Sequence, residues 1–420
     1  MIDKYLIDKI AGKYIMASED DQVKLNMQVI YTGEEAPLKI NKSIMLCGPS
    51  ARPGQDIESW RDDAIKILKD KGFSGTIFSP ENKFGKFSSN FSYDDQVEWE
   101  HKHLNMADCI VFWVPRDLSL DKNNQMKLPA LTTNIEWGKW NDSGKVIFGC
   151  PPDLKERKNT YLKYYADFYK VDGGSTLTET LDAAMDMLGD GAERVDGERF
   201  VPLYIWNTES FQSWYAAHKK AGNRLDHAEL LWNFRPGNKK FVFLWALKVD
   251  IFVQSENRNK TNEFVLARSD ISSVLLWNKK TPIEDSEVVL VKEFRSPANN
   301  PDCFIRELPG GSSLNNKEDP KDLASHELFE ETGFVIKSDR LKSHGARQLA
   351  GTFSAHKSNL YSAELDDEEM KWFKSQKDIK HGNIEDSEIT YIEIYKVSDL
   401  IKYNLVDYST LGQIFSAIYS

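Results

Sequence analysis

The sequence predicts an α/β protein with two main domains, a doubly wound parallel sheet in its N-terminal half and a strand-rich domain in its C-terminal half. The length of 420 residues exceeds that of one ordinary domain. Between residues 42 and 190, short apolar runs alternate with helical patterns, which indicates parallel strands covered by helices on both faces. From Phe241 onward, short β-branched and aromatic runs indicate a sheet with few helices between its strands.

The composition narrows the class of function. The formal net charge is −11 and the isoelectric point is near 5.4, so a general nucleic-acid-binding surface is not expected. The four cysteines form no CxxC pair, and three of them lie in apolar, strand-like surroundings typical of reduced core thiols. No signal-peptide pattern and no run of 18 apolar residues is present. We therefore expect a cytoplasmic protein that acts on a small molecule, without nucleic-acid or membrane partners.

The elements of the N-terminal half follow in a regular order. Residues 1–41 form an extension in which weak alternation favours at most a short β element. The domain at 42–190 then alternates strands and helices. The expected strands are 43–47, 75–78, 109–114 and 145–149, and the expected helices are 56–71, 93–106, 133–140, 157–169 and 176–188. Ligands of such sheets bind at the carboxyl ends of the strands, which here fall at 48–52, 80–81, 115–117 and 150–152.

Several short motifs lie at or near these strand ends. They are Cys47-Gly48-Pro49, Ser59-Trp60-Arg61, Ser79-Pro80-Glu81, Tyr93-Asp94 with Trp99-Glu100, Ala107-Asp108, Phe112-Trp113-Val114-Pro115-Arg116, and the run from Thr132 to Gly138. Together they resemble the nucleoside 2-deoxyribosyltransferase family and its N-glycosidase relatives. The resemblance implies a flavodoxin-like fold and a glutamate nucleophile that attacks the anomeric carbon of the sugar, here Glu136. It also implies an acidic residue that helps proton transfer to the base, eight positions before Asp108. That residue is Glu100, where the classical enzymes carry aspartate.

The residue types suit this chemistry. A carboxylate can form a covalent glycosyl-enzyme and release it to water or to a second base, and two carboxyls with different pKa values can serve as nucleophile and acid. Taken alone, Glu136 would read as a solvated helix carboxylate. The expected substrate-binding residues of this domain are Gly48, Arg52, Asp108, Arg116, Thr132 and Thr133. By resemblance, a homo-oligomer is the expected assembly.

Residues 191–239 are expected to form a helical connector. The predicted helices are Ser210–Gly222, which carries an aromatic stripe, and His227–Phe234. We expect the stripe to pack against a neighbouring domain, with nucleotide stacking as the alternative. The last domain, 240–420, begins with strands. Its expected strands are 241–253, 263–268, 273–277, 288–294, 361–365 and 389–395, and its last helices are 397–403 and 409–418.

The most specific stretch of the chain runs from Glu307 to Phe334. Glu327, Glu330 and Glu331 would lie on one face of a helix that begins at Asp319-Pro320 and ends at Gly333. Three like charges on one stripe repel each other, and a hard cation such as Mg²⁺ or Mn²⁺ would offset them. The alternative is a solvated acidic face.

This pattern resembles the Nudix box. The matching residues are Glu318, Glu327, Leu328, Glu330, Glu331, Gly333 and Phe334, whereas His326 takes the arginine position and the spacing from Gly311 to Glu318 is one residue longer than in the family. The resemblance implies an α/β/α fold with a mixed sheet and hydrolysis of a nucleoside diphosphate derivative. It implies metal ligation by Glu327, Glu330, Glu331 and the Gly311 carbonyl, with Glu330 and Glu331 also catalytic. It also implies a substrate contact from Arg295 and a further acid at Glu385 or Glu388, which could equally be solvated.

The two resemblances together predict a bifunctional nucleotide-processing enzyme, since nucleotides contain both an N-glycosidic and a phosphoanhydride bond. One alternative is an enzyme that degrades NAD and then ADP-ribose. Another is a nucleotide-sensing protein without turnover. The sequence leaves open the base, ribose versus deoxyribose, and transfer versus hydrolysis.

Overall fold

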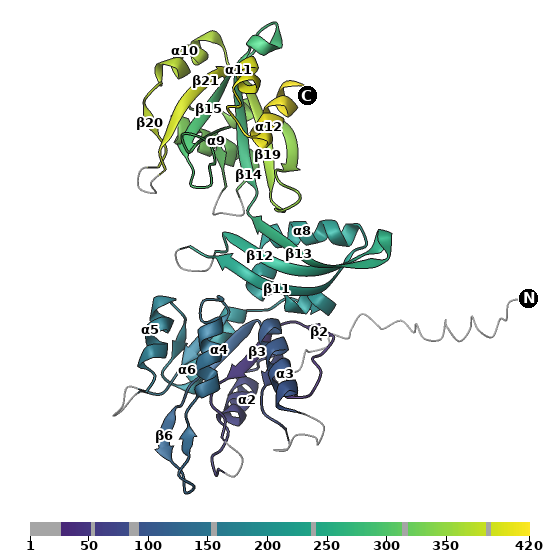
Figure 1. Ribbon diagram of the computed structural model, residues 1–420, viewed down its shortest axis with the longest axis vertical. Helices are drawn as coiled ribbons and strands as arrows, with labels where there is room; N and C mark the ends of the chain where they lie inside the picture. The colour runs from purple at the N-terminus through teal and green to yellow at the C-terminus, as the bar shows by residue number, and fades with distance from the viewer. Residues whose placement is uncertain are drawn as a thin grey trace, which may run out of the picture. The chain divides into compact units, whose positions relative to one another are not determined.

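The computed structural model describes residues 27–51, 55–83, 92–152, 158–236, 241–312, 318–383 and 388–420. The chain divides into two compact units, Met1–Val195 and Asp196–Ser420 (Figure 1). The predicted connector at 191–239 therefore falls mostly within the second unit. No helix in these ranges has the length and apolar character needed to cross a membrane.

The first unit is built on a six-stranded parallel sheet in the order β1-β4-β3-β5-β8-β9. Without the edge strand β1, this is the doubly wound order 2-1-3-4-5 of flavodoxin-like folds, as the sequence predicts. The strands are β1 Gln28–Tyr31, β3 Ser43–Cys47, β4 Thr76–Ser79, β5 Cys109–Trp113, β8 Val146–Gly149 and β9 Gly173–Gly174. β3, β4, β5 and β8 are buried along their whole length, which accounts for their continuous apolar runs.

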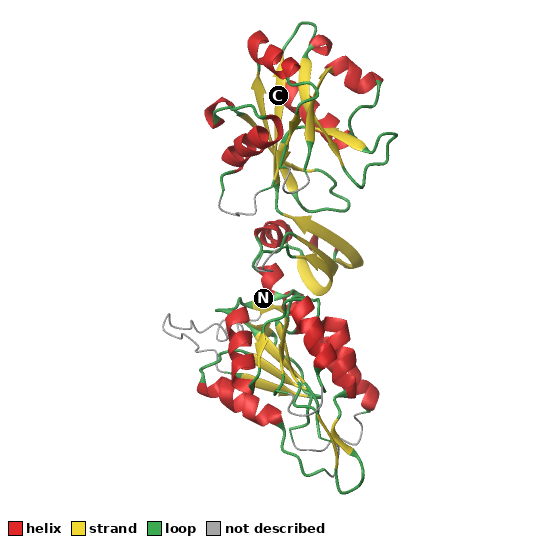
Figure 2. Ribbon diagram, turned by 90° about the vertical axis from the view of Figure 1, so that its left-hand side faces the viewer, coloured by secondary structure: helices red, strands yellow, loops and turns green. Residues whose placement is uncertain are grey.

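Helices cover both faces of this sheet (Figure 2). They are α2 Trp60–Asp70, α3 Tyr93–Met106, α4 Leu131–Trp140, α5 Thr160–Phe168 and α6 Leu177–Leu188. Each agrees with a predicted helix to within a few residues. Two strand pairs lie outside the sheet, β2 Lys39–Ile40 with β10 Arg194–Val195 and the hairpin β6 Asp117–Leu120 with β7 Met126–Leu128. Three of the four cysteines are buried free thiols, as predicted.

The second unit begins with η1 Asp196–Phe200, α7 Leu203–Trp206 and α8 Glu209–Lys220. An antiparallel sheet follows, in the order β11 Arg224–Phe234, β12 Leu244–Val253 and β13 Arg258–Arg268, with η2 at Gln254–Glu256. The helix predicted at 227–234 is therefore wrong. Pairing with β12 along nearly the whole of β11 overrides the local helical pattern. The aromatic stripe of α8 packs on this sheet, where Phe211 contacts Trp245 at 5.7 Å between ring centroids.

A second, mixed sheet forms the rest of this unit, in the order β18-β19-β14-β15-β21-β20, with β16 paired to β15 and β17 paired to β14. β14 and β19 run parallel, and the other pairs are antiparallel. The strands are β14 Ile271–Asn278, β15 Glu287–Phe294, β16 Phe304–Glu307, β17 Gly310–Gly311, β18 Lys342–Gln348, β19 Lys357–Glu364, β20 Lys380–His381 and β21 Thr390–Lys396.

Alternate residues of β14 point to two separate cores. Val274 and Leu276 pack beneath α9 Pro320–Thr332 and α10 Asp367–Ser375, whereas Leu275 and Trp277 pack beneath α11 Val397–Lys402 and α12 Tyr408–Ile418. The sheet therefore lies between two helical layers (Figure 2). The remaining short helices are η3 Ile283–Asp285 and η4 Ser338–Arg340.

Candidate functional site

The first candidate site lies where β3 and β5 end side by side, because strand order reverses between these two strands. Gly48 follows β3 directly, and a Cβ atom at this position would lie 2.2 Å from the Trp113 carbonyl oxygen. It would also lie 2.7 Å from the Trp60 ring, whose Nε1 donates to the Pro49 carbonyl at 3.0 Å. Only glycine permits this close approach, so Gly48 shapes the loop through its lack of a side chain.

The buried side chain of Arg61 holds this loop in place. Its side chain is 2% exposed and donates to the carbonyls of Leu46 and Gly48, at 3.0 and 2.8 Å, and to Ser50 Oγ at 2.9 Å. Its Nη1 also forms an ion pair with Glu81 Oε1 at 2.7 Å. One buried guanidinium therefore ties the ends of β3 and β4 together. The sequence places Arg61 in the Ser59-Trp60-Arg61 motif but does not reveal this role.

Two carboxyl groups, Glu136 on α4 and Glu100 on α3, face this region from neighbouring helices. Both are half-buried. Burial raises the pKa of Glu136 to about 7, repulsion from Glu100 adds to the shift, and the charge of Arg61 opposes it. Burial also raises the pKa of Glu100, whereas a hydrogen bond from Gln96 and the charge of Arg61 lower it. The structure thus brings together the two carboxyls that the sequence singled out.

The partners of the two carboxyls differ. Gln96 Nε2, one turn earlier on α3, donates to Glu100 Oε1 at 2.8 Å. Glu136 accepts no hydrogen bond from any residue in the described ranges. Glu136 therefore keeps its acceptor capacity for a ligand, while Glu100 is held in a defined orientation.

The other predicted contacts of this unit fall into three groups. Arg116 follows β5 and donates to the side chains of Asn134 and Asn159, at 2.5 and 3.0 Å, so it joins the starts of α4 and α5. On the first turn of α4, Thr132 is exposed, whereas Thr133 is buried and its Oγ1 has no partner among the described residues. Arg52 lies outside the described residues.

Asp108 must be removed from the predicted substrate contacts. It precedes β5, at the end of the strand opposite to the candidate site. Its carboxylate is fully buried, receives two 2.6 Å hydrogen bonds from Arg194, and accepts one from Ser43 Oγ at 2.9 Å. The residue anchors β10 to the sheet and has no access to a ligand.

The second candidate site surrounds α9 in the other unit. Glu331 Oε2 accepts a hydrogen bond from the Gly310 N–H at 2.9 Å. A Cβ atom on Gly311 would lie 2.4 Å from Glu327 Oε2, so glycine is needed for Glu327 to occupy this place. Burial and repulsion from Glu330 raise the pKa of Glu327 to about 7. Burial also holds the pKa of Glu331 well above its usual range, although the Gly310 N–H opposes the shift.

Further charged groups border these carboxyls. His326 Nδ1 contacts Glu318 Oε1 at 2.8 Å, so histidine forms the contact at the arginine position of the motif. Glu330 is exposed, and the charges of Glu330 and Glu388 both act on Glu327. Glu385 lies outside the described residues. Arg295 forms ion pairs with Glu293 and Glu307, at 2.8 and 3.4 Å, which fixes its guanidinium close to the cluster.

The described residues of this cluster do not form a complete set of ligands for a divalent cation. Among the described residues, no group of three or more His, Cys, Asp or Glu side chains is arranged to hold a metal ion. The oxygen donors are of the type that Mg²⁺ prefers, and the carboxyls of Glu327 and Glu331 both lie beside β17, Gly310–Gly311. These two carboxyls are the part of the predicted ligand set that the fold brings together.

Comparison with known proteins gives one result for the first unit. Residues 41–154 match the family described as nucleoside 2-deoxyribosyltransferase like. No curated protein matches the chain. The matched range contains Gly48, Arg61, Glu100 and Glu136, so the carboxyl pair lies within the part of the chain that is similar to this family.

Proposed function

We propose that the first unit cleaves or exchanges the N-glycosidic bond of a (deoxy)nucleoside or nucleotide, with Glu136 as the nucleophile. Residues 41–154 form a nucleoside 2-deoxyribosyltransferase-like domain, which suggests glycosyl transfer or cleavage on a nucleoside. The observation that carries the proposal is the pair of half-buried carboxyls at the carboxyl end of the sheet, one of which has no partner among the described residues.

The proposed reaction has two steps. Glu136 attacks the anomeric carbon, the bond between this carbon and the base nitrogen breaks, and Glu100 gives its proton to the departing base. A glycosyl ester of Glu136 remains. Water or a second base then attacks the same carbon, Glu100 removes a proton from the attacking group, and the Glu136 carboxylate is released.

The location of the proton in the free protein matters for this scheme. Glu136 carries the larger upward shift, whereas the amide of Gln96 favours the ionised form of Glu100. Repulsion from Glu100 adds to the upward shift in the pKa of Glu136, so Glu136 holds its proton more tightly than an isolated glutamate does. Substrate binding must leave this proton on Glu100, so that Glu136 is free to attack.

A base-release assay tests the proposal. The purified protein would be incubated with ribo- and deoxynucleosides and their monophosphates, and free base would be measured by mass spectrometry. We expect release that Glu136→Ala abolishes and Glu100→Gln reduces by roughly 100-fold or more. The control is Glu98→Gln, an exposed carboxyl on the same helix. Release that survives Glu136→Ala would contradict the assignment of the nucleophile.

For the second unit we propose metal-dependent hydrolysis of a nucleoside diphosphate derivative. The support is the match to the Nudix pattern, together with the three-layer arrangement of helices and mixed sheet and the carboxyl cluster beside β17. Glu327, Glu331 and a glycine carbonyl would hold Mg²⁺ or Mn²⁺, and Glu330 would complete the site or orient water. The ion would neutralise charge on the phosphate oxygens. Arg295, which forms ion pairs with Glu293 and Glu307, would contact the substrate.

Glu331→Gln tests this second proposal. Its glutamine Oε1 can still accept the Gly310 N–H, so we expect an intact fold and loss of Mg²⁺-dependent hydrolysis of ADP-ribose, nucleotide sugars or nucleoside triphosphates. Glu368→Gln, an exposed position on α10, is the matched control. Full hydrolysis by a folded Glu331→Gln protein would refute the assignment.

The two proposed reactions can act on one molecule in either order. The second unit would convert a nucleoside triphosphate or diphosphate derivative to a monophosphate, whose base the first unit removes or exchanges. In the other order, the first unit would release nicotinamide from NAD and the second would cleave the ADP-ribose. Ligand-induced stabilisation without turnover on any of these compounds would instead favour a nucleotide sensor.

A further inference from the structure

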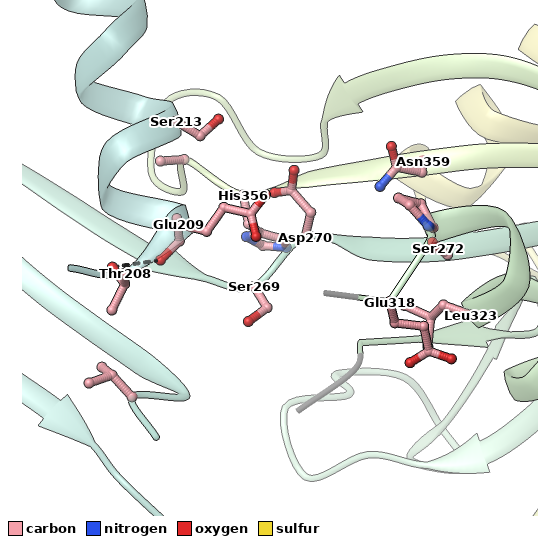
Figure 3. Close-up of a pocket in the computed structure, with 14 residues that line it drawn as sticks. Thr208, Glu209, Ser213, Ser269, Asp270, Ser272, Glu318, Leu323, His356 and Asn359 are labelled. Carbon is pink, nitrogen blue, oxygen red and sulfur yellow. Dashed lines mark hydrogen bonds between the residues drawn. The ribbon is translucent and has the colours of Figure 1, made fainter. Parts of the chain in front are cut away.

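A cavity of about 260 Å³ in the second unit has no described residue of either candidate site in its wall. It is here named the aromatic cavity, after Trp214, Phe264 and Phe353 in its wall. It shares Ala355 with a larger cavity of about 300 Å³, which borders the second candidate site through Glu318 (Figure 3). The wall of the aromatic cavity comes from α8, β12, β13 and the segment 348–355, which leads from β18 to β19.

The aromatic cavity has an apolar floor and aromatic sides. The floor consists of alternate residues of β12, whose side chains lie on one face of the sheet, namely Val249, Ile251 and Val253. Trp214 is half-buried, whereas Phe264 and Phe353 are 60% and 62% exposed. A ligand can therefore reach the two phenylalanine rings from solvent. Aromatic side chains of this kind are platforms on which flat heterocycles stack.

The segment that carries Phe353 is fixed to the antiparallel sheet. The Leu266 N–H donates to the Phe353 carbonyl at 3.3 Å, and the Ala355 N–H donates to the Leu266 carbonyl at 2.8 Å. The segment therefore pairs with β13 through a parallel bridge between Leu266 and Ser354. The Phe353 ring is thus held at the cavity by its backbone, and a ligand that covers this exposed ring would remove apolar surface from water.

His218 supplies a hydrogen-bond donor of defined position on its ring. Asn223 Oδ1 accepts the Gln254 N–H at 3.1 Å, which fixes the orientation of the amide. Asn223 Nδ2 therefore donates to His218 Nδ1 at 3.3 Å. Burial lowers the pKa of His218, so the ring is neutral near pH 7 and its hydrogen lies on Nε2. This N–H has no acceptor among the described residues and is not closed off from solvent.

Gln348 supplies an acceptor in the same wall. Its Nε2 donates to the Ser354 carbonyl at 3.2 Å, which sets the orientation of the amide and leaves Oε1 as an acceptor. Gln348 is exposed, and within the described ranges no group donates to its Oε1. Lys260 and Glu263, which form an ion pair at 3.1 Å, complete the polar wall. The cavity thus offers a donor, an acceptor and aromatic faces to one ligand.

We propose that the aromatic cavity binds a nucleobase, with one face of the base on Phe353 and its edge paired with His218 and Gln348. Nucleobases combine flat faces that stack with edges that carry both donors and acceptors. Sites for whole drug-sized ligands have volumes of roughly 300–1,000 Å³. A cavity of about 260 Å³ therefore suits the base, and the rest of a nucleoside or nucleotide would lie outside it. The inference depends on neither proposed reaction.

Hydrogen–deuterium exchange on the full chain tests the proposal and separates this cavity from the carboxyl pair of the first unit. The probes are adenine, hypoxanthine, cytosine and uracil, their ribonucleosides and 5′-monophosphates, and ribose 5-phosphate as the probe without a base. A free base contains neither bond that the proposed reactions break, so it is not consumed. We expect at least one base series to protect residues 214–223 and 348–355.

The members of that series identify the form in which the base is recognised. The free base, the nucleoside or the monophosphate that protects at the lowest concentration is the preferred form, and ribose 5-phosphate should protect neither segment. No protection by any probe that contains a base would overturn the proposal. Equal protection by ribose 5-phosphate and the monophosphates would also overturn it, because the phosphate and not the base would then be recognised.

Phe353→Ala tests the stacking contact. The ring is 62% exposed, so we expect an intact fold. The Kd, taken from the concentration dependence of protection, should rise roughly 5- to 150-fold, which is the range for one lost stacking contact. Phe168→Ala on α5, where the ring is 63% exposed, is the matched control and should leave the Kd unchanged. An unchanged Kd in Phe353→Ala would overturn the proposal.

His218→Phe tests the edge contact. The variant keeps a ring beside Trp214, which lies 4.9 Å from the imidazole between ring centroids, but it removes the Nε2–H donor. We expect the Kd to rise roughly 2- to 10-fold, as for the loss of one hydrogen bond. Equal affinity of the folded variant and the unaltered protein for every base would contradict the pairing at His218. If the variant does not fold, Phe353→Ala decides the case.

Discussion

At the scale of single residues, the environment of Glu136 decides how the first unit responds to pH. Burial, repulsion from Glu100 and the opposing charge of Arg61 together set its pKa at about 7. Arg61 is itself fixed by hydrogen bonds to Leu46 and Gly48, so the same guanidinium shapes the loop and moderates the charge of the carboxyl pair. The loop and the Glu136 carboxyl are therefore coupled through one buried side chain.

The first prediction concerns the rate of base release. Glu136 must be ionised to attack, so we expect kcat/KM to fall as the pH drops below about 7. In Glu100→Gln the repulsion is gone, and the acid limb should move to lower pH even though the maximal rate falls. A pH–rate profile of both proteins checks this. An acid limb that stays in place in the variant would show that Glu100 does not act on Glu136.

The second prediction concerns stability. The pKa of Glu136 is raised on folding, so the folded protein binds more protons than the unfolded chain between the usual glutamate pKa and about pH 7. This contribution is present at low pH and is lost as the pH rises through that window. We expect the free energy of unfolding to change with pH by roughly 1–2 kcal/mol less in Glu136→Gln than in the unaltered protein. The figure is modest because partial solvent access weakens the pKa shift. Urea unfolding at about pH 5 and pH 8 measures it, and identical pH dependence in both proteins would contradict it.

Motif positions identify residue types along the chain but not their distant partners. They predicted that Glu136 and Glu100 belong to one site, and the structure brings these two carboxyls close enough to repel each other. Asp108 lay in a similar motif, but its role depends on Arg194, a partner 86 residues away that no local pattern reveals. The shared role of Arg61 was missed for the same reason, since its partners come from β3 and from the loops that follow β3 and β4.

At the scale of elements, local signals predicted helices better than strands. The boundaries of α3 were predicted to the residue, and Ser92 and Asp95 form a capping box at its start. β11 was taken for a helix because its strand character comes from pairing with β12. The hairpin β6–β7 was not predicted, because its alternating residues extend over strands of only four and three residues. Its position directly after β5 places it beside the candidate site.

The third prediction compares two glycines of the first unit. A Cβ on Gly48 would lie 2.2 Å from the Trp113 carbonyl oxygen, whereas a Cβ on Gly138 of α4 would meet nothing within 4 Å. We expect Gly48→Ala to destabilise the unit by about 2 kcal/mol or more. Gly138→Ala should stabilise it by about 0.5–1 kcal/mol through helix propensity. Denaturant unfolding of the two variants measures the change in the free energy of unfolding for each. Equal changes in the two variants would contradict the packing described for Gly48.

The fourth prediction concerns the anchor between β10 and the sheet. Asp108→Asn leaves the charge of Arg194 buried without its counterion, so we expect a loss of about 3–5 kcal/mol. Asp108→Leu combined with Arg194→Met should recover most of this loss, because both charges are removed together. Urea unfolding of Asp108→Leu, Arg194→Met and the double variant completes a double-mutant cycle, which measures the coupling free energy between the two side chains. A cost below about 1 kcal/mol for the single variant would show that the pair is dispensable.

At the scale of the whole molecule, the chain joins a unit similar to nucleoside 2-deoxyribosyltransferases to a second unit with a mixed sheet between helices. The division into an N-terminal parallel-sheet unit and a strand-rich unit followed from the spacing of apolar runs. The boundary near residue 195 did not, since β10 belongs to the first unit through its pairing with β2 and through the ion pair of Arg194 with Asp108, which no local pattern reveals. The cavity of the second unit shown in Figure 3 was equally beyond the sequence, because its described wall comes from five separate segments.

Trapping the glycosyl ester tests most directly whether Glu136 forms a covalent bond to the sugar. The protein would be mixed with each nucleoside and deoxynucleoside or its monophosphate, quenched in acid within seconds, digested with pepsin and analysed by mass spectrometry. We expect a glycosyl adduct on the peptide that contains Glu136, absent from Glu136→Gln and retained in Glu98→Gln. Base release without any adduct on Glu136, or an adduct on another residue, would contradict it.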